Sequence, residues 1–167
     1  NWVFVDLIHL IFPNAKMTHV RRNPLSYGVA NFRQYYAQGH NFSYSFDHLG
    51  RYYRNYVRMI ERFETAAPGR ICRVIYEELV TRTEDEVRRI LAFLDLPFND
   101  DCLRFYENDR TIRTPSSEQV RQPINQDGLH SWKKYEPWLE PLKDSLGSVL
   151  DTYPAVPADL KSSIRGG

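Results

Sequence analysis

The spacing of apolar residues predicts helices over much of the chain. Residues 3–12 are apolar on most faces, which is typical of a buried helix. Apolar positions recur at helical spacing from Pro24 to about Gly39, and Asn23 is a suitable N-cap for that helix. A second apolar stripe predicts a helix over residues 47–66.

Two short runs predict strands. Residues 16–20 (KMTHV) follow the Pro13-Asn14 break, and residues 71–76 (ICRVIY) are rich in β-branched side chains and follow the Pro68-Gly69 turn. The resulting order of strand, helix, helix, strand and helix is typical of an α/β protein with a parallel sheet between helices. Two strands are few for a complete sheet, so we expect further strands upstream of Asn1.

The C-terminal half has weaker signals. Thr83 followed by Glu86 predicts a capping box that opens a helix, and Asn99 or Asp100 would cap one more short helix. Residues 108–128 show no period, which in a compact domain suggests a binding loop. We expect a last helix over residues 139–150, a frayed segment from Pro154, and hence one domain over residues 1–150 with a tail over 151–167.

Composition narrows the class of partner. The 167 residues contain 22 Lys and Arg against 21 Asp and Glu, so no overall field favours nucleic acid or a membrane surface, and any anion site must be local. The five histidines form no spaced pair, so we expect no metal. The first apolar run is interrupted by Asp6 and His9 and is too short to span a membrane, and we expect a cytoplasmic protein.

Two adjacent arginines stand where the first strand meets the next helix. Ligands of open parallel sheets bind beyond the carboxyl ends of the strands, where Arg21 and Arg22 would lie. A helix that opens at Asn23-Pro24 would add free N–H groups, and the guanidinium fork suits phosphate. Alternation points the two arginines to opposite faces, so only one should reach a ligand. Pairing with carboxylates, or solvation, is the alternative.

These residues resemble a known family. The run Arg-Arg-Asn-Pro after a strand is similar to the 3′-phosphate motif of sulfotransferases that use 3′-phosphoadenylyl sulfate. VIYEELV, RRILAFLDLPF, SSEQVRQPIN and HSWKKYEPWLEPL follow in the family's order over about residues 1–145. The resemblance is strongest to bacterial sulfotransferases often joined to tetratricopeptide repeats and to protein-tyrosine sulfotransferases. It implies a P-loop-NTPase-like sulfotransferase fold, of which this chain would be the C-terminal portion.

The resemblance assigns roles to particular residues. It implies that Arg22 holds the 3′-phosphate, that Tyr76 lies close to the nucleotide, and that Ser116 contacts the nucleotide and helps to stabilise the transferring sulfonate. The family's nucleotide loop also covers Gln119, Val120 and Asn125. Packing at the end of the sheet is the alternative for Tyr76, and a solvent loop is the alternative for residues 116–125.

Two positions depart from the family pattern. A serine eight residues after Arg22 usually adds a second phosphate ligand, but Ala30 stands there. Ser26, one turn earlier, could replace it only in a shifted geometry. Ser131 stands before Trp132, where the family generally has Lys or Arg, with Lys133 and Lys134 on the other side. Both departures weaken the expected phosphate sub-site.

The catalytic half of the family's site is expected upstream. The printed sequence has no Gly-rich loop between a strand and a helix to hold the bridging phosphate, and the family's base and catalytic lysine would precede Asn1. We therefore expect this chain alone to turn over nothing. Its acceptor would bear a hydroxyl on a protein tyrosine, a sugar or a small molecule, and neither that choice nor the oligomeric state can be read from the residues.

Three other functions compete with this one. A P-loop kinase-like phosphotransferase would also use a strand–Arg–helix site, but the motifs over residues 116–132 disfavour it. A degenerate module that only binds a nucleotide or partner is favoured by Ala30 and Ser131. A nucleic-acid binder is suggested by the mixture of Arg and aromatic residues around residues 31–46, but the neutral charge balance disfavours it.

Overall fold

A computed structural model describes residues 2–34, 36, 41–108 and 119–162 of the chain. The N-terminal part contains, in order, the 3₁₀ turn η1 (Trp2–Phe4), α1 (Val5–Ile11), β1 (Met17–Arg21), α2 (Pro24–Arg33), η2 (Asn41–Tyr44), α3 (Phe46–Ala66) and β2 (Ile71–Ile75). The C-terminal part contains α4 (Tyr76–Thr81), α5 (Thr83–Phe93), η3 (Asp100–Cys102), η4 (Phe105–Glu107), η5 (Gln119–Arg121), η6 (Ser131–Trp138), α6 (Glu140–Leu146), α7 (Ser148–Thr152) and α8 (Ala158–Ser162).

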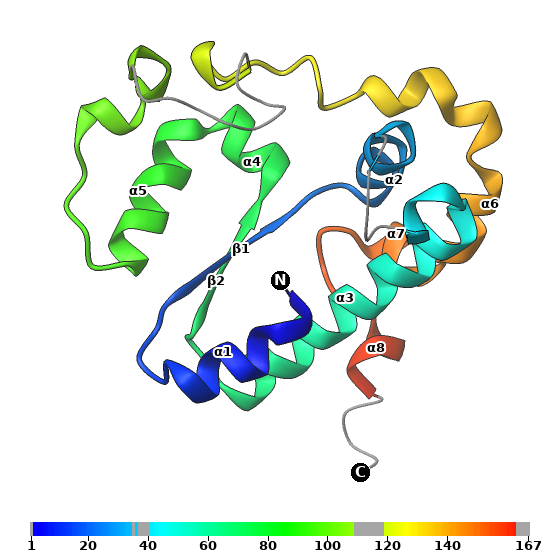
Figure 1. The fold of residues 1–167 in the computed structure, drawn as a ribbon, viewed down its shortest axis with the longest axis horizontal. Helices are drawn as coiled ribbons and strands as arrows, with labels where there is room; N and C mark the ends of the chain where they lie inside the picture. Colours follow the sequence, from blue (N-terminus) through cyan, green and yellow to red (C-terminus); the bar gives the residue numbers. More distant parts are fainter. Residues whose placement is uncertain (1, 35, 37–40, 109–118, 163–167) are drawn as a thin grey trace.

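β1 and β2 form a small parallel sheet. Met17 lies opposite Ile71 and Arg21 opposite Ile75, so both strands end at the same level. The paired strands run between α5 on one side and α1 and α3 on the other (Figure 1). The predicted α/β class with a parallel sheet between helices is confirmed to this extent, as a helix-rich protein with two strands.

The core lies between the helices rather than on the sheet. The long helix α3 packs along α6, with α2, α7 and α8 around them (Figure 1). The core side chains are apolar except for the phenol of Tyr53: Leu25, Val29, Leu49, Tyr53, Val57, Leu139, Leu142, Leu146, Val149, Val156 and Leu160. The close approach of α3 to α6 depends on Gly50, because a Cβ there would lie 2.6 Å from Ser145 Cβ.

The first helix forms where predicted but is not buried. Of its side chains only Val5 is buried, whereas several large apolar side chains are more than half exposed. These are Val3, Phe4, Leu10, Ile11 and Phe12. The expected helix is confirmed over Val5–Ile11, and the expectation that it is buried is wrong.

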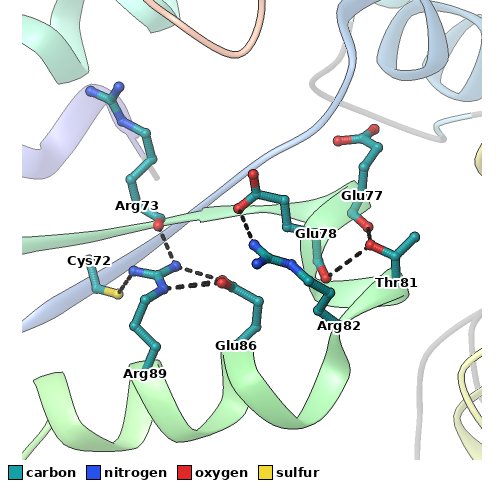
Figure 2. Close-up of polar contacts among 8 residues, drawn as sticks. All are labelled: Cys72, Arg73, Glu77, Glu78, Thr81, Arg82, Glu86 and Arg89. Carbon is teal, nitrogen blue, oxygen red and sulfur yellow. Dashed lines mark hydrogen bonds and ion pairs between the residues drawn. The ribbon is translucent and has the colours of Figure 1, made fainter.

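The predicted capping box on α5 does not form. Thr83 donates its hydroxyl to the carbonyl of Leu79, and no side chain caps this helix. Glu86 is instead 4% exposed and accepts from Arg89, which also donates to the carbonyl of Arg73 and to Sγ of Cys72 (Figure 2). Arg89 thereby ties α5 to the edge of β2.

The C-terminal segment is ordered rather than frayed. The helix expected over residues 139–150 is broken at Gly147, whose φ of +52° is in the left-handed region, into α6 and α7. Beyond Pro154 the chain packs again, with Val156 and Leu160 buried in the core. The expectation of fraying from Pro154 is wrong as far as Leu160.

Candidate functional site

The parallel register brings Arg22 and Tyr76 together. Each follows directly on a strand, after the paired residues Arg21 and Ile75, so both lie at the carboxyl edge of the sheet. The guanidinium carbon of Arg22 lies 4.7 Å from the centroid of the Tyr76 ring, within cation–π distance. Two residues 54 positions apart thus form one polar, aromatic edge where ligands of parallel sheets bind.

Arg21 points the other way and is structural. It is 2% exposed, and its Nη1 donates to the carbonyl of Pro154 at 2.8 Å. Its Nε donates to the Tyr53 hydroxyl at 3.4 Å, and its guanidinium lies 5.3 Å from the ring of Tyr153. The two side chains thus lie on different sides of the strand end, as alternation predicts, and that Arg22 alone reaches a ligand stays a prediction.

An open cavity of about 540 Å³ lies against Arg22 and Tyr76. Its other lining residues come from α4, η4, η5 and the segment after η5: Leu79, Val80, Phe105, Val120, Gln122, Pro123, Ile124, Asn125, Asp127 and Gly128. Among these described residues Arg22 is the one cation and Asp127 the one anion. The cavity wall therefore combines apolar and polar side chains with one positive and one negative charge.

The Arg22 guanidinium is held by a backbone carbonyl and has one buried N–H without a partner among the described residues. Its Nη2 donates to the carbonyl of Gly128 at 2.9 Å. Its Nε is buried and has no hydrogen-bond partner among the described residues. Nη2 of Arg21 is likewise buried without a partner among the described residues, so an unpaired N–H does not by itself distinguish the two arginines. Arg22 differs in its place beside Tyr76 in the wall of the cavity.

Ser26 also has an unsatisfied group, but it lies in the interior. It is 2% exposed, its Oγ has no partner among the described residues, and it is not part of the cavity wall. Ala30, where the family has its serine, is exposed on α2. Neither residue therefore lies where it completes the phosphate sub-site in this arrangement.

The start of α2 offers no free N–H groups. The Asn23 side chain accepts from the backbone N–H groups of Leu25 and Ser26, both at 3.1 Å. The N–H of Asn23 itself donates to the Glu77 carboxylate at 3.0 Å. The expectation that this helix terminus binds the anion is wrong, because capping has used its donors. Binding of an anion here depends on the Arg22 side chain.

The remaining predicted residues are divided between the cavity and the undescribed part of the chain. Val120 and Asn125 line the cavity, and Asn125 also accepts from the N–H of Asp127 at 3.2 Å. Gln119 begins η5, but its side chain is not among those described, and Ser116 lies outside the described residues. Ser131 donates to the carbonyl of Gly128 at 3.3 Å.

Three participants were not predicted. Gly128 supplies the carbonyl that holds Arg22, and Phe105 adds an aromatic wall. The Glu77 carboxylate accepts a hydrogen bond from the backbone N–H of Asn23, the residue after Arg22. The Asp127-Gly128 dipeptide is a turn signal that could have marked the first. Phe105 and Glu77 have no local pattern, since their roles arise from contacts across the fold.

Two features are absent from the part of the chain that the structure describes. In these residues no three His, Cys, Asp or Glu side chains cluster as they would around a metal ion. None of the described helices combines the length and apolarity needed to cross a membrane.

Fold and site together define an α/β protein with an arginine and a tyrosine at the ends of two parallel strands, beside an open cavity. The chain belongs to the sulfotransferase family: the model of that family matches residues 1–100, including Arg22, Ser26 and Tyr76. The predicted family is thereby confirmed.

The chain is also similar to individual proteins. The chain is 33% identical over 149 residues to an uncharacterized protein of Aquifex aeolicus, a match that covers 87% of this chain and 20% of that protein. It is 34% identical over 79 residues to protein-tyrosine sulfotransferase A of Caenorhabditis elegans, covering 44% of this chain and 21% of the other. It is 33% identical over 84 residues to the protein-tyrosine sulfotransferase of Drosophila melanogaster, a match that covers 44% of this chain and 16% of that protein. The chain thus spans about a fifth of the length of these relatives.

Proposed function

We propose that this chain forms the part of a sulfotransferase that binds the 3′-phosphate and adenosine of 3′-phosphoadenylyl sulfate. The whole protein would transfer sulfonate from this co-substrate to an acceptor hydroxyl. The observation that carries the proposal is the place of Arg22, which lines the cavity beside the Tyr76 ring at the carboxyl ends of the two strands.

The residues around Arg22 suit a phosphorylated nucleoside. Arg22 would donate to the 3′-phosphate, and the Tyr76 ring would restrict the arginine to one orientation. Phe105 and Val120 offer apolar and aromatic surface against which a purine can pack. Asn125 and Gln122 add side-chain amides for ring nitrogens or ribose hydroxyls. Nothing in this set is suited to metal, so we propose none.

The bound co-substrate supplies an activated sulfonate. The role of the described residues is to bind and orient it, since a fixed nucleotide holds the reacting group in place. We propose that Ser116 contacts the nucleotide and the transferring sulfonate, as the family resemblance implies, and that Gln119 contributes to nucleotide binding. Ser26 is buried away from the cavity, so we do not propose it as a ligand. The phosphate-loop contribution to a P-loop-like fold is not found in the printed sequence, and we propose that these 167 residues alone do not turn over substrate.

For the acceptor we propose a hydroxyl of protein tyrosine. The support is the similarity to protein-tyrosine sulfotransferases of Caenorhabditis elegans and Drosophila melanogaster, together with the order of motifs. Sugars and small alcohols are the competing acceptors.

A second candidate is a module that binds nucleotide or partner without catalysis. Ala30 is exposed and cannot donate, and the Ser131 hydroxyl already donates to Gly128. On this hypothesis the chain retains nucleotide affinity through Arg22 but contributes to no transfer in the whole protein.

Calorimetry with 3′-phosphoadenosine 5′-phosphate, with 5′-AMP as the reference ligand, tests the proposal. We expect the 3′-phosphorylated nucleotide to bind at least tenfold more tightly, and Arg22→Ala to abolish that preference, since a hydrogen bond to a charged group is worth about 1.5–3 kcal/mol. Equal affinities in the unmodified chain would contradict the proposal. A preference for ATP over both would favour the kinase-like alternative.

A further inference from the structure

Arg22 lies in a short junction that is fixed from three directions. The carbonyl of Arg22 accepts from the Tyr53 hydroxyl of α3 at 2.6 Å. The next group along the backbone, the N–H of Asn23, donates to the carboxylate of Glu77 on α4 at 3.0 Å. The preceding residue, Arg21, is bound to the carbonyl of Pro154. Both sides of the Arg22–Asn23 peptide group are therefore held by side chains from distant elements.

Glu77 connects two of these restraints. While Oε1 accepts from Asn23, Oε2 accepts from the hydroxyl of Tyr153 at 2.5 Å. The ring of Tyr153 in turn lies against the Arg21 guanidinium. Burial and the hydrogen bond to Glu77 raise the pKa of the Tyr153 phenol well above its ordinary value, so the phenol remains a donor. The C-terminal segment is thus coupled to the strand–helix junction through one carboxylate.

Its neighbour Glu78 has no such role. Glu78 lies on the same helix and pairs at 3.6 Å with Arg82, and Figure 2 shows the Glu77 side chain extending away from that pair. The two adjacent glutamates therefore differ in their contacts but not in their charge.

We propose that Glu77 is a positioning residue: with Tyr153, it sets the backbone at Arg22–Asn23 and so aims the Arg22 guanidinium at the 3′-phosphate. This inference rests on the proposed nucleotide site. Because the 3′-phosphate alone depends on the direction of Arg22, loss of Glu77 should weaken binding of the 3′-phosphorylated nucleotide far more than binding of 5′-AMP.

The test compares the ratio of affinities for 3′-phosphoadenosine 5′-phosphate and 5′-AMP in the full 167-residue chain and its variants. Glu77→Ala should lower the ratio about tenfold, a loss similar to that of one charge-assisted hydrogen bond. Glu77→Gln has the same shape and an oxygen for the Asn23 N–H, and should restore the ratio to within about threefold. The matched control Glu78→Ala should leave the ratio unchanged.

Each outcome has a distinct meaning. An unchanged ratio in folded Glu77→Ala overturns the inference while leaving the nucleotide site intact. Absence of any preference in the unmodified chain overturns the proposed function, and the inference with it. If Glu77→Ala does not fold, the variant Tyr153→Phe tests the inference instead. It keeps the aromatic ring against Arg21 and removes only the hydroxyl that donates to Glu77. A lowered ratio of affinities in this variant supports the inference, and an unchanged ratio overturns it.

Discussion

The guanidinium of Arg22 lies 4.7 Å from the centre of the Tyr76 ring, although the two residues are 54 positions apart. The contact follows from strand register, since each residue is the first beyond its strand and the last paired residues are Arg21 and Ile75. It restricts the arginine to the wall of the cavity, with Nη2 bound to Gly128. A cation held in this way needs little reorganisation to meet an anion.

The Tyr76 ring should matter more than its hydroxyl. Tyr76→Phe keeps the aromatic face against Arg22 and should change the affinity for 3′-phosphoadenosine 5′-phosphate by less than about threefold. Tyr76→Leu removes the face and should weaken binding by about tenfold, as the loss of a partly desolvated cation–π contact of about 1–2 kcal/mol implies. Calorimetric titration of both variants measures this, and equal losses in the two would refute the role of the ring.

The two arginines should respond oppositely to substitution. Arg21 is almost fully buried with bonds to Pro154 and Tyr53, so Arg21→Ala should lower the free energy of unfolding by about 2–4 kcal/mol. Arg22→Ala should change that free energy by less than about 1 kcal/mol while removing the preference for the 3′-phosphate. Urea denaturation followed by circular dichroism measures the first effect. Similar losses of stability in both variants would show that Arg22 is structural as well.

Much of this arrangement could be predicted from the sequence, because the signals are local. The strands, α3 and the strand–Arg–helix junction follow from period, β-branching and the Asn-Pro start. The expected burial of α1 is wrong, because apolar composition does not specify which other segment covers a helix. The roles of Glu77 and Gly128 escaped prediction because their partners, Asn23 and Arg22, lie 54 and 106 positions away.

Stability should fall in mildly acidic solution through His19. Burial, together with the positive charges of Arg73 and Arg21, lowers the pKa of this imidazole to about 4, from about 6.5 in the unfolded chain. A group whose pKa is lowered by folding contributes its full stabilisation above pH 6.5 and loses it as the pH falls toward 4. The loss is of the order of 3 kcal/mol.

Denaturation at several pH values between 4 and 7 checks this effect. His19→Gln should flatten the decline in that window, whereas His48→Gln, at an exposed position on α3, should not. A decline of the same steepness in His19→Gln would assign the pH dependence to other groups.

The contact of α3 with α6 should be intolerant of a methyl group. A Cβ at Gly50 would lie 2.6 Å from Ser145 Cβ and 2.9 Å from the Ser145 carbonyl carbon, so Gly50→Ala must separate the two helices. The expected loss of stability is about 1–3 kcal/mol, as for an overpacked core. Asn55→Ala, at an exposed position of the same helix, should stay within about 0.5 kcal/mol of the parent in the same thermal or urea titration. If Gly50→Ala were as stable as the parent, the helices would not be in this close contact.

The most direct measurement compares two isomers of the same charge, adenosine 3′,5′-bisphosphate and adenosine 2′,5′-bisphosphate, for binding to the parent chain and to Arg22→Ala. General attraction of anions cannot separate these ligands, so a difference reports where the phosphate is read. We predict that the parent prefers the 3′-isomer by about tenfold or more and that Arg22→Ala binds both equally. Equal binding of both isomers by the parent would contradict a 3′-phosphate site at Arg22.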